Sequence, residues 1–116
     1  MFKEVKIGDK SVPMLANGST PIRYRMLFSK DILSEFQAIQ NDSTKTETIG
    51  ELGYVMAMQS MANEGKFDLV KLNTNGYIKW LEQFDPFDIE MAAEDIIGVY
   101  IGNMASSSIP KKKEEQ

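Results

Sequence analysis

The segment from Thr48 to Gly65, TIGELGYVMAMQSMANEG, constrains the fold of this chain more than any other stretch. Projected at about 100° per residue, its apolar side chains form no single stripe. They occupy nearly opposite sides of the predicted helix: Ile49, Leu52 and Met56 on one, and Tyr54, Met58 and Met61 on the other. A helix that is apolar nearly all round is central in its domain or lends a face to a partner.

The residues before this helix predict a β-hairpin and two helices. Val5 and Ile7 alternate with charged residues, and the alternation resumes after a turn at Gly8-Asp9. Thr20-Pro21 is typical of a helix start, because proline suits the first helical position. The apolar residues that follow form two groups at helical spacing: Ile22, Met26 and Leu27, and then, after a cap at Ser29, Ile32, Leu33, Phe36 and Ile39. Residues 40–47 are expected to form a polar loop.

The residues after the central helix predict two more helices. Residues 66–72 fit either a short strand or a helical turn, and residues 73–84 fit a helix with Tyr77, Leu81 and Phe84 on one face. Asp85-Pro86 would cap a last helix with an inward stripe of Ile89, Ala93, Ile96, Ile97, Tyr100 and Met104. On this helix Gly98 and Gly102 lie one turn apart, which would let another helix approach closely.

The whole pattern predicts a mainly α fold of about five helices with a short N-terminal β-hairpin. At 116 residues the chain is expected to hold one domain, over residues 1–105. A disordered polar tail would follow over residues 106–116, where serine, proline and lysine replace the apolar side chains.

The composition excludes several classes of function. The chain has no histidine and no cysteine, so it lacks the commonest general base, the commonest transition-metal ligands and any thiolate nucleophile. Its net charge of −4 argues against nucleic-acid binding. No apolar run approaches the ~20 residues that span a bilayer. We therefore expect a cytoplasmic protein that is not an enzyme and needs neither cofactor nor metal. The carboxylates Asp85, Asp88, Glu90, Glu94 and Asp95 are interpreted as helix caps and solvated side chains.

Methionine is the one unusual feature that remains, with eight in the chain and three of them, Met56, Met58 and Met61, on the central helix. These side chains could simply fill the core, or they could form an adaptable surface for a partner, since methionine packs in many shapes. Under the second interpretation, the partner-binding residues would be Tyr54, Met58 and Met61.

Three stretches resemble one family. They are NGSTPIRYRMLFSKDILSEF, GYVMAMQ and YIKWLEQFDPFDIEMAAEDIIGVYIGNM, with Pro21–Arg25 and Trp80–Phe84 carrying most of the likeness. They are similar to the tail assembly chaperones of long-tailed phages and prophages of Gram-positive bacteria. The resemblance covers about residues 1–105 and rests on core and cap positions, because the family has no catalytic motif.

The resemblance implies a protein of the infected cell that is absent from the finished virion. Such a chaperone binds the tape measure protein and keeps its long helices soluble, and it helps to recruit the tail tube protein. The family commonly has a short product and a longer one made by a −1 frameshift, and this chain is similar to the short product. Its partners would be the tape measure protein, the tail tube protein and the longer form of itself, and homo-oligomerisation stays open.

The tail has two interpretations. Lys111–Lys113 could be a solubilising end, or their codons could form the site at which ribosomes change frame. A different function also stays open for the whole chain, that of a small phage or plasmid adaptor that binds a host protein stoichiometrically.

Overall fold

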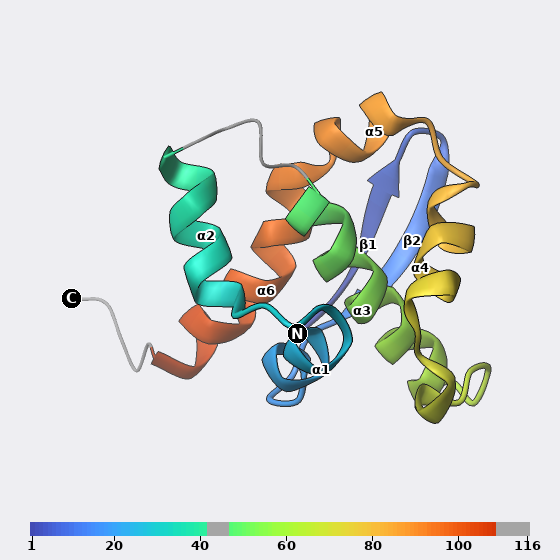
Figure 1. Cartoon of the computed structure of the whole chain (residues 1–116), viewed down its shortest axis with the longest axis horizontal. Coiled ribbons are helices and arrows are strands. Elements are labelled where there is room, and N and C mark those ends of the chain that lie inside the picture. The colour runs from blue at the N-terminus through green and yellow to red at the C-terminus, as the bar shows by residue number, and fades with distance from the viewer. Residues whose placement is uncertain (42–46, 109–116) are drawn as a thin grey trace.

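Helix α3 (Glu47–Asn63) runs through the middle of the molecule, and the other elements pack around it (Figure 1). The computed structural model describes residues 1–41 and 47–108, apart from the side chains of residues 40, 41 and 103–108. Every residue from Thr48 to Ser60 is buried, which confirms the central position expected from the apolar pattern. Among the elements that pack against α3 are β2 (Lys10–Leu15), α1 (Thr20–Phe28), α4 (Thr74–Leu81), α5 (Pro86–Met91) and α6 (Ala93–Ser108).

The predicted N-terminal hairpin is confirmed. Strand β1 (Phe2–Ile7) pairs antiparallel with β2 in a register that sets Val5 opposite Val12. The turn needs the left-handed backbone of Gly8, where φ is 64°. Val5, Ile7 and Met14 are buried on the face of the hairpin that covers the helices. Alternation of apolar and charged residues therefore identified both the strands and their inner face.

Helix α1 begins as expected, but it turns a different face inward. Ile22 and Met26 are exposed, and the fully buried side chain is Tyr24. Thr20, expected to cap the helix, is its buried first residue, and its hydroxyl accepts a hydrogen bond from Nε2 of Gln59 at 2.8 Å. Hydrogen bonds thus help to decide which face of α1 packs on α3. The spacing of aliphatic residues in the sequence does not reveal such bonds.

Helix α2 (Ile32–Asn41) is capped by Asp31 and not by Ser29. A carboxylate oxygen of Asp31 accepts hydrogen bonds from the backbone N–H and the hydroxyl of Ser34. Ser29 instead ends α1 in the left-handed region, with φ 57°. Ile32 is buried as expected, whereas Leu33 is exposed. Of the polar loop expected at 40–47, residues 42–46 lie outside the described part of the chain, and residues 40, 41 and 47 are helical.

The ambiguous segment at 66–72 forms a single 3₁₀ turn, η1 (Leu69–Lys71), capped by the Asp68 side chain. Helix α4 follows, with the side chain of Asn73 accepting the backbone N–H of Gly76. Trp80 is buried, and Tyr77 and Leu81 are half-buried beside it. The predicted helix and its inward face are therefore confirmed, but the helix is shorter than the expected 73–84 and ends at Leu81.

The last predicted helix is divided in two. Asp85 caps α5 as expected, accepting the N–H of Phe87 at 2.9 Å, but α5 ends at Met91 and α6 starts at Ala93. The break at Ala92 brings Ala92 and Val99 into the core in addition to Ile89 and Ile96. The side chain of Met104 lies outside the described residues. Helix α6 continues through Ser108, three residues past the expected domain boundary at 105, and residues 109–116 are outside the described range.

The glycines of α6 do not form a helix-packing notch. A Cβ atom added to Gly98 would meet nothing within 4 Å, and this residue is exposed. At Gly102 the neighbour would be the side chain of Met1 and not a second helix. The expectation of a close helix–helix approach here was wrong, because the face of α6 that carries Gly98 points to solvent.

Candidate partner-binding surfaces

The three residues predicted to bind a partner lie at different depths. Tyr54 is 2% exposed and packs between Tyr77 and Trp80, with ring centroids 5.6 and 5.8 Å away. Met58 is 8% exposed, and Met61 is 37% exposed. Tyr54 is therefore a core residue that a partner cannot reach in this fold. The structure brings Met58 and Met61 together at one hollow of the surface, without Tyr54.

The Met61 hollow has a volume of about 390 Å³ and lies between β2, α3 and the end of α4. Met58 and Ala57 reach it from α3, and Val12 and Pro13 reach it from β2. Its mouth carries one basic residue, Lys10. Helix α3 is thus buried over most of its surface but still lends one edge to a depression, at the end of its methionine-rich stretch.

A second depression, the Met26 hollow, lies between α1 and η1 and has a volume of about 510 Å³. Met26 and Val70 stand at its rim with 79% and 90% of their side-chain surface exposed. Arg23 and Asp68 supply one charge of each sign. The sequence contained a signal for this surface, since Met26 lies on the opposite side of α1 from Tyr24. The exposure of Met26 can be predicted from this position only when the inward face of α1 is known.

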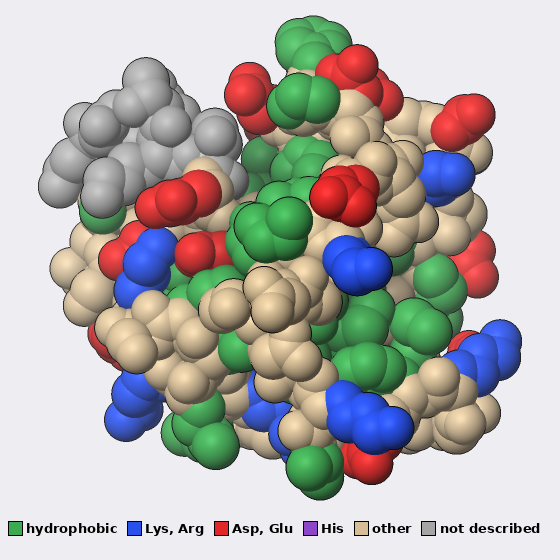
Figure 2. Space-filling view, turned by 45° about the vertical axis from the view of Figure 1, so that its right-hand side comes forward, with side chains coloured by type: hydrophobic (Ala, Val, Ile, Leu, Met, Phe, Trp, Pro, Cys, Tyr) green, Lys and Arg blue, Asp and Glu red, His purple; other side chains and the backbone are tan. Residues whose placement is uncertain are grey.

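The third depression, the α4–α5 groove, has a volume of about 320 Å³. Its apolar lining comes from α4, the connection after it and α5: Tyr77, Leu81, Phe84, Pro86 and Ile89. Both charged residues at its edge, Glu47 and Glu90, are acidic. Burial, together with the charges of Glu51 and Glu47, raises the pKa of Tyr77 to about 12, so its phenol stays neutral. The groove thus offers apolar contacts within a negative rim. Figure 2 shows hydrophobic side chains reaching the surface in several patches with charged side chains between them.

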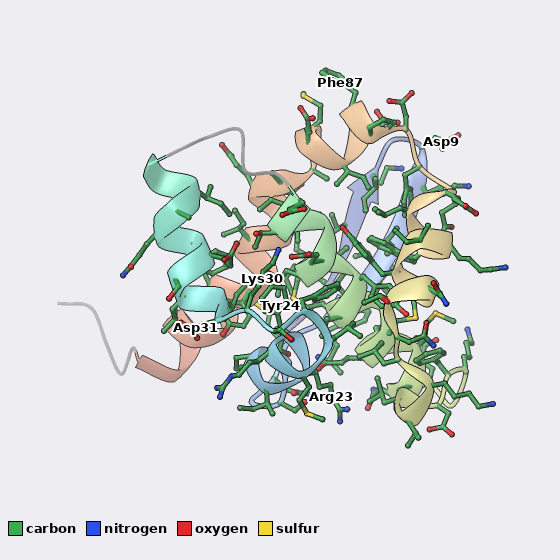
Figure 3. The ribbon with its side chains drawn as sticks, in the orientation of Figure 1. Asp9, Arg23, Tyr24, Lys30, Asp31 and Phe87 are labelled. Carbon is green, nitrogen blue, oxygen red and sulfur yellow. The ribbon has the colours of Figure 1, made fainter. Side chains whose placement is uncertain are left out.

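A buried polar cluster joins α1, the connection between α1 and α2, and α3; Figure 3 labels two of its members, Tyr24 and Lys30. Glu51 of α3 is 6% exposed; it accepts a hydrogen bond from the Tyr24 hydroxyl at 2.8 Å and pairs with Nζ of Lys30 at 3.2 Å. Burial and the hydrogen bond to Glu51 raise the pKa of Tyr24. For Lys30, burial acts to lower the pKa, but the hydrogen bonds to Glu51 and Glu47 outweigh it and raise the pKa.

The raised pKa values of Tyr24 and Lys30 favour a structural role for this cluster over a reactive one. Lys30 keeps its proton and so offers no free amine as a nucleophile, and Tyr24 keeps its proton and so offers no phenolate as a base. The burial of Glu51 was not predicted, because a single carboxylate in an apolar helix usually faces solvent. The one sequence feature that indicated this burial is the apolar character of the helix on nearly all sides, which leaves no face for a solvated carboxylate.

Asp85 and Asp95, two of the other acidic residues, make local contacts. Asp85 caps α5, and Asp95 lies 3.8 Å from Lys3 in an exposed pair. Within residues 1–41 and 47–108, no three carboxylates lie close enough to hold a metal ion. No helix in the same ranges is long and apolar enough to cross a membrane.

No protein-family model matches the chain, and neither a curated protein sequence nor a solved structure matches it.

Proposed function

We propose that this chain is a phage tail assembly chaperone, which binds helical segments of the tape measure protein and keeps them soluble until the tail tube protein is recruited. The observation that carries the proposal is that each of the three depressions has an exposed methionine beside it. Met26 and Met61 line two of them, and Met91, on α5, stands next to the third. The resemblance of residues 17–36, 53–59 and 77–104 to such chaperones supplies the identity of the partner.

Flexible methionine side chains suit this task. An unbranched thioether chain can fit many apolar shapes, so one surface can accept successive stretches of a long helical partner. Shallow depressions bury little area, and each contact is therefore weak and reversible. Many copies bound along one tape measure would gain avidity without any tight single site. Weak contacts would also let the polymerising tube displace the chaperone.

The proposed function also implies where the protein acts and which proteins it meets. The chain would act in the cytoplasm of the infected cell and would be missing from the mature virion. It would work beside a longer frameshifted form that shares its N-terminal domain. Lys111–Lys113 would lie at the point where the two products diverge.

Co-expression with the tape measure protein encoded beside it tests this function. We expect the tape measure protein to be soluble with the chaperone and insoluble without it. Replacing Met26 and Met61 by serine should return most of it to the insoluble fraction, because both side chains are exposed and the fold does not need them.

The matched control replaces two apolar residues outside the depressions, Phe2→Ser and Leu33→Ser, whose side chains are both 53% exposed. This control should keep the tape measure protein soluble. Equal loss of solubility in both double variants would reject the depressions as the binding surface. A tape measure protein that remains insoluble beside the unaltered chain would reject the function itself.

A further inference from the structure

Helix α5 presents an apolar ridge that the rest of the domain leaves uncovered. Phe87 and Met91 are 63% and 69% exposed, and they lie four residues apart, so their side chains are neighbours on the helix surface. Figure 3 shows Phe87 pointing away from the body of the molecule. The opposite side of α5 carries Ile89, which is buried. The ridge is therefore not needed for packing within the chain.

The ridge and the α4–α5 groove form one continuous surface. Pro86 and Ile89 line the groove from α5, and Glu90 stands at its edge. At about 100° per residue, Glu90 falls between Pro86 and the ridge, so the groove ends where the ridge begins. The far wall of the groove is formed by Tyr77 and Leu81 of α4, and Ile78, the residue after Tyr77, is 53% exposed. An elongated partner could contact both walls at once.

The charge of this surface has one sign. No lysine or arginine occurs between Lys79 and Lys111 of the sequence, whereas six carboxylates do: Glu82, Asp85, Asp88, Glu90, Glu94 and Asp95. Glu82, Asp85, Glu90 and Glu94 are exposed. In Figure 2, hydrophobic side chains at the top of the molecule, over α5, stand among acidic ones.

Ion pairs with Lys30 and Lys3 involve Glu47, Glu51 and Asp95, and they include none of the exposed carboxylates Glu82, Asp85, Glu90 and Glu94 among the pairs found in the described residues. Lys30 bonds Glu47 at 3.3 Å and Glu51 at 3.2 Å, and Lys3 lies 3.8 Å from Asp95. The other two depressions differ in charge, because Arg23 balances Asp68 at the Met26 hollow and Lys10 lies at the Met61 hollow. An acidic rim around apolar contacts is thus a property of the α4–α5 groove alone among these three surfaces.

We infer that the α4–α5 groove and the Phe87–Met91 ridge bind an amphipathic helix whose apolar stripe is flanked by lysine and arginine. The inference rests on the proposed function in taking a helical partner, and it adds the surface and the charge of that partner. The apolar stripe would cover Phe87, Met91 and the groove, and the basic flanks would meet Glu82, Glu90 and Glu94. A second copy of this chain fits poorly, since two acidic surfaces of the same kind would repel one another.

The test uses a fluorescent synthetic peptide of leucine and lysine, about 18 residues or five helical turns long, with leucine on one face. Its affinity for the full chain is measured by anisotropy. The same peptide with glutamate in place of lysine should not bind. Phe87→Ser with Met91→Ser should weaken binding of the lysine peptide by about tenfold or more, because two exposed apolar contacts are lost while the charge is unchanged.

A second variant isolates the charge. Glu90→Gln with Glu94→Gln should weaken binding and flatten its dependence on salt between about 0.05 and 0.5 M, since fewer screened ion pairs remain. The matched control, Phe2→Ser with Leu33→Ser, removes two exposed apolar side chains outside the three depressions and should leave the affinity within about twofold. Circular dichroism checks that all variants are folded.

Three outcomes would overturn the inference: equal binding of the glutamate peptide, an equal loss in the Phe2 and Leu33 variant, or no loss in the ridge variant. A dimer that disappears on ridge substitution, without peptide binding, would make a second copy the occupant. The function is judged separately by solubility of the tape measure protein. If the tape measure protein stays soluble with the ridge variant, the ridge is not its binding surface, but the chaperone function stands. If the peptide binds but the tape measure protein stays insoluble beside the unaltered chain, the ridge binds basic helices, but the chaperone function is rejected.

Discussion

At the scale of single residues, Glu51 holds the first half of the chain against the central helix. It lies 27 residues from Tyr24 and 21 from Lys30 in the sequence, and it accepts hydrogen bonds from both. A buried carboxylate is costly unless its oxygens are paired, and removal of one member leaves the others unsatisfied. Its contribution therefore lies in selecting which face of α1 packs inward.

We expect Glu51→Ala to lower the free energy of unfolding by about 2 kcal/mol, because the Tyr24 hydroxyl would lose its buried acceptor. Glu64→Ala is the matched control, since Glu64 pairs with Lys66 at 3.1 Å on an exposed part of the surface. That substitution should change stability by no more than about 0.5 kcal/mol. Urea denaturation of the three proteins measures both differences, and equal effects would show that the buried cluster contributes nothing special.

At the scale of elements, the helices differ in how closely their neighbours approach. Gly50 on α3 faces α4 so closely that an added Cβ atom would lie 2.8 Å from the hydroxyl oxygen of Tyr77. Gly98 on α6 has open space around it. One glycine is required by packing, and the other only weakens its helix.

Gly98→Ala should therefore stabilise the domain by about 0.5–1 kcal/mol, since alanine restricts the unfolded chain and favours the helix. Gly50→Ala should destabilise it, because the new methyl group must displace Tyr77 from the wall of the α4–α5 groove. Thermal unfolding followed by circular dichroism compares the two variants with the unaltered protein. A melting temperature raised by both substitutions would contradict the close contact between α3 and α4.

At the scale of the whole molecule, every one of the four tyrosines takes part in the packed interior. Burial is the main cause that raises the pKa of each: Tyr24, Tyr54, Tyr77 and Tyr100. Three of them lie in one chain of aromatic contacts, in which Phe28 bridges Tyr24 and Tyr77, and Tyr77 packs on Tyr54. Ionisation of these phenols is thus linked to unfolding of the domain.

The stability of the domain should fall as the pH rises above about 10. The unfolded chain loses its phenolic protons near the ordinary tyrosine pKa of about 10, while the folded protein keeps them, and at Tyr77 it keeps them to about 12. The raised pKa of Lys30 acts in the same direction, because its ion pairs with Glu51 and Glu47 require the protonated amine.

Phenolate absorbance and circular dichroism, followed together in an alkaline titration, measure this linkage. We expect both signals to change in one step well above pH 10. A group of tyrosines that ionises near pH 10 in the folded protein would contradict the buried positions. Urea denaturation at neutral pH and at about pH 11 gives the corresponding loss of stability.

The hairpin, the cap at Asp85 and the central place of α3 could be predicted from the sequence, because alternation, capping chemistry and all-round apolarity are local properties. Three features depend on tertiary packing and could not be predicted from the sequence: α1 turns Tyr24 inward, Glu51 is buried, and the last predicted helix breaks at Ala92. Tertiary packing also decided which apolar side chains stay uncovered, so Tyr54 became core while Phe87 and Met91 became surface. These outcomes depend on residues tens of positions apart, such as Gln59 and Thr20, which lie 39 residues apart and share a hydrogen bond. A periodic pattern shows which side chains avoid water, but the partner that covers each one is chosen only when the whole chain packs.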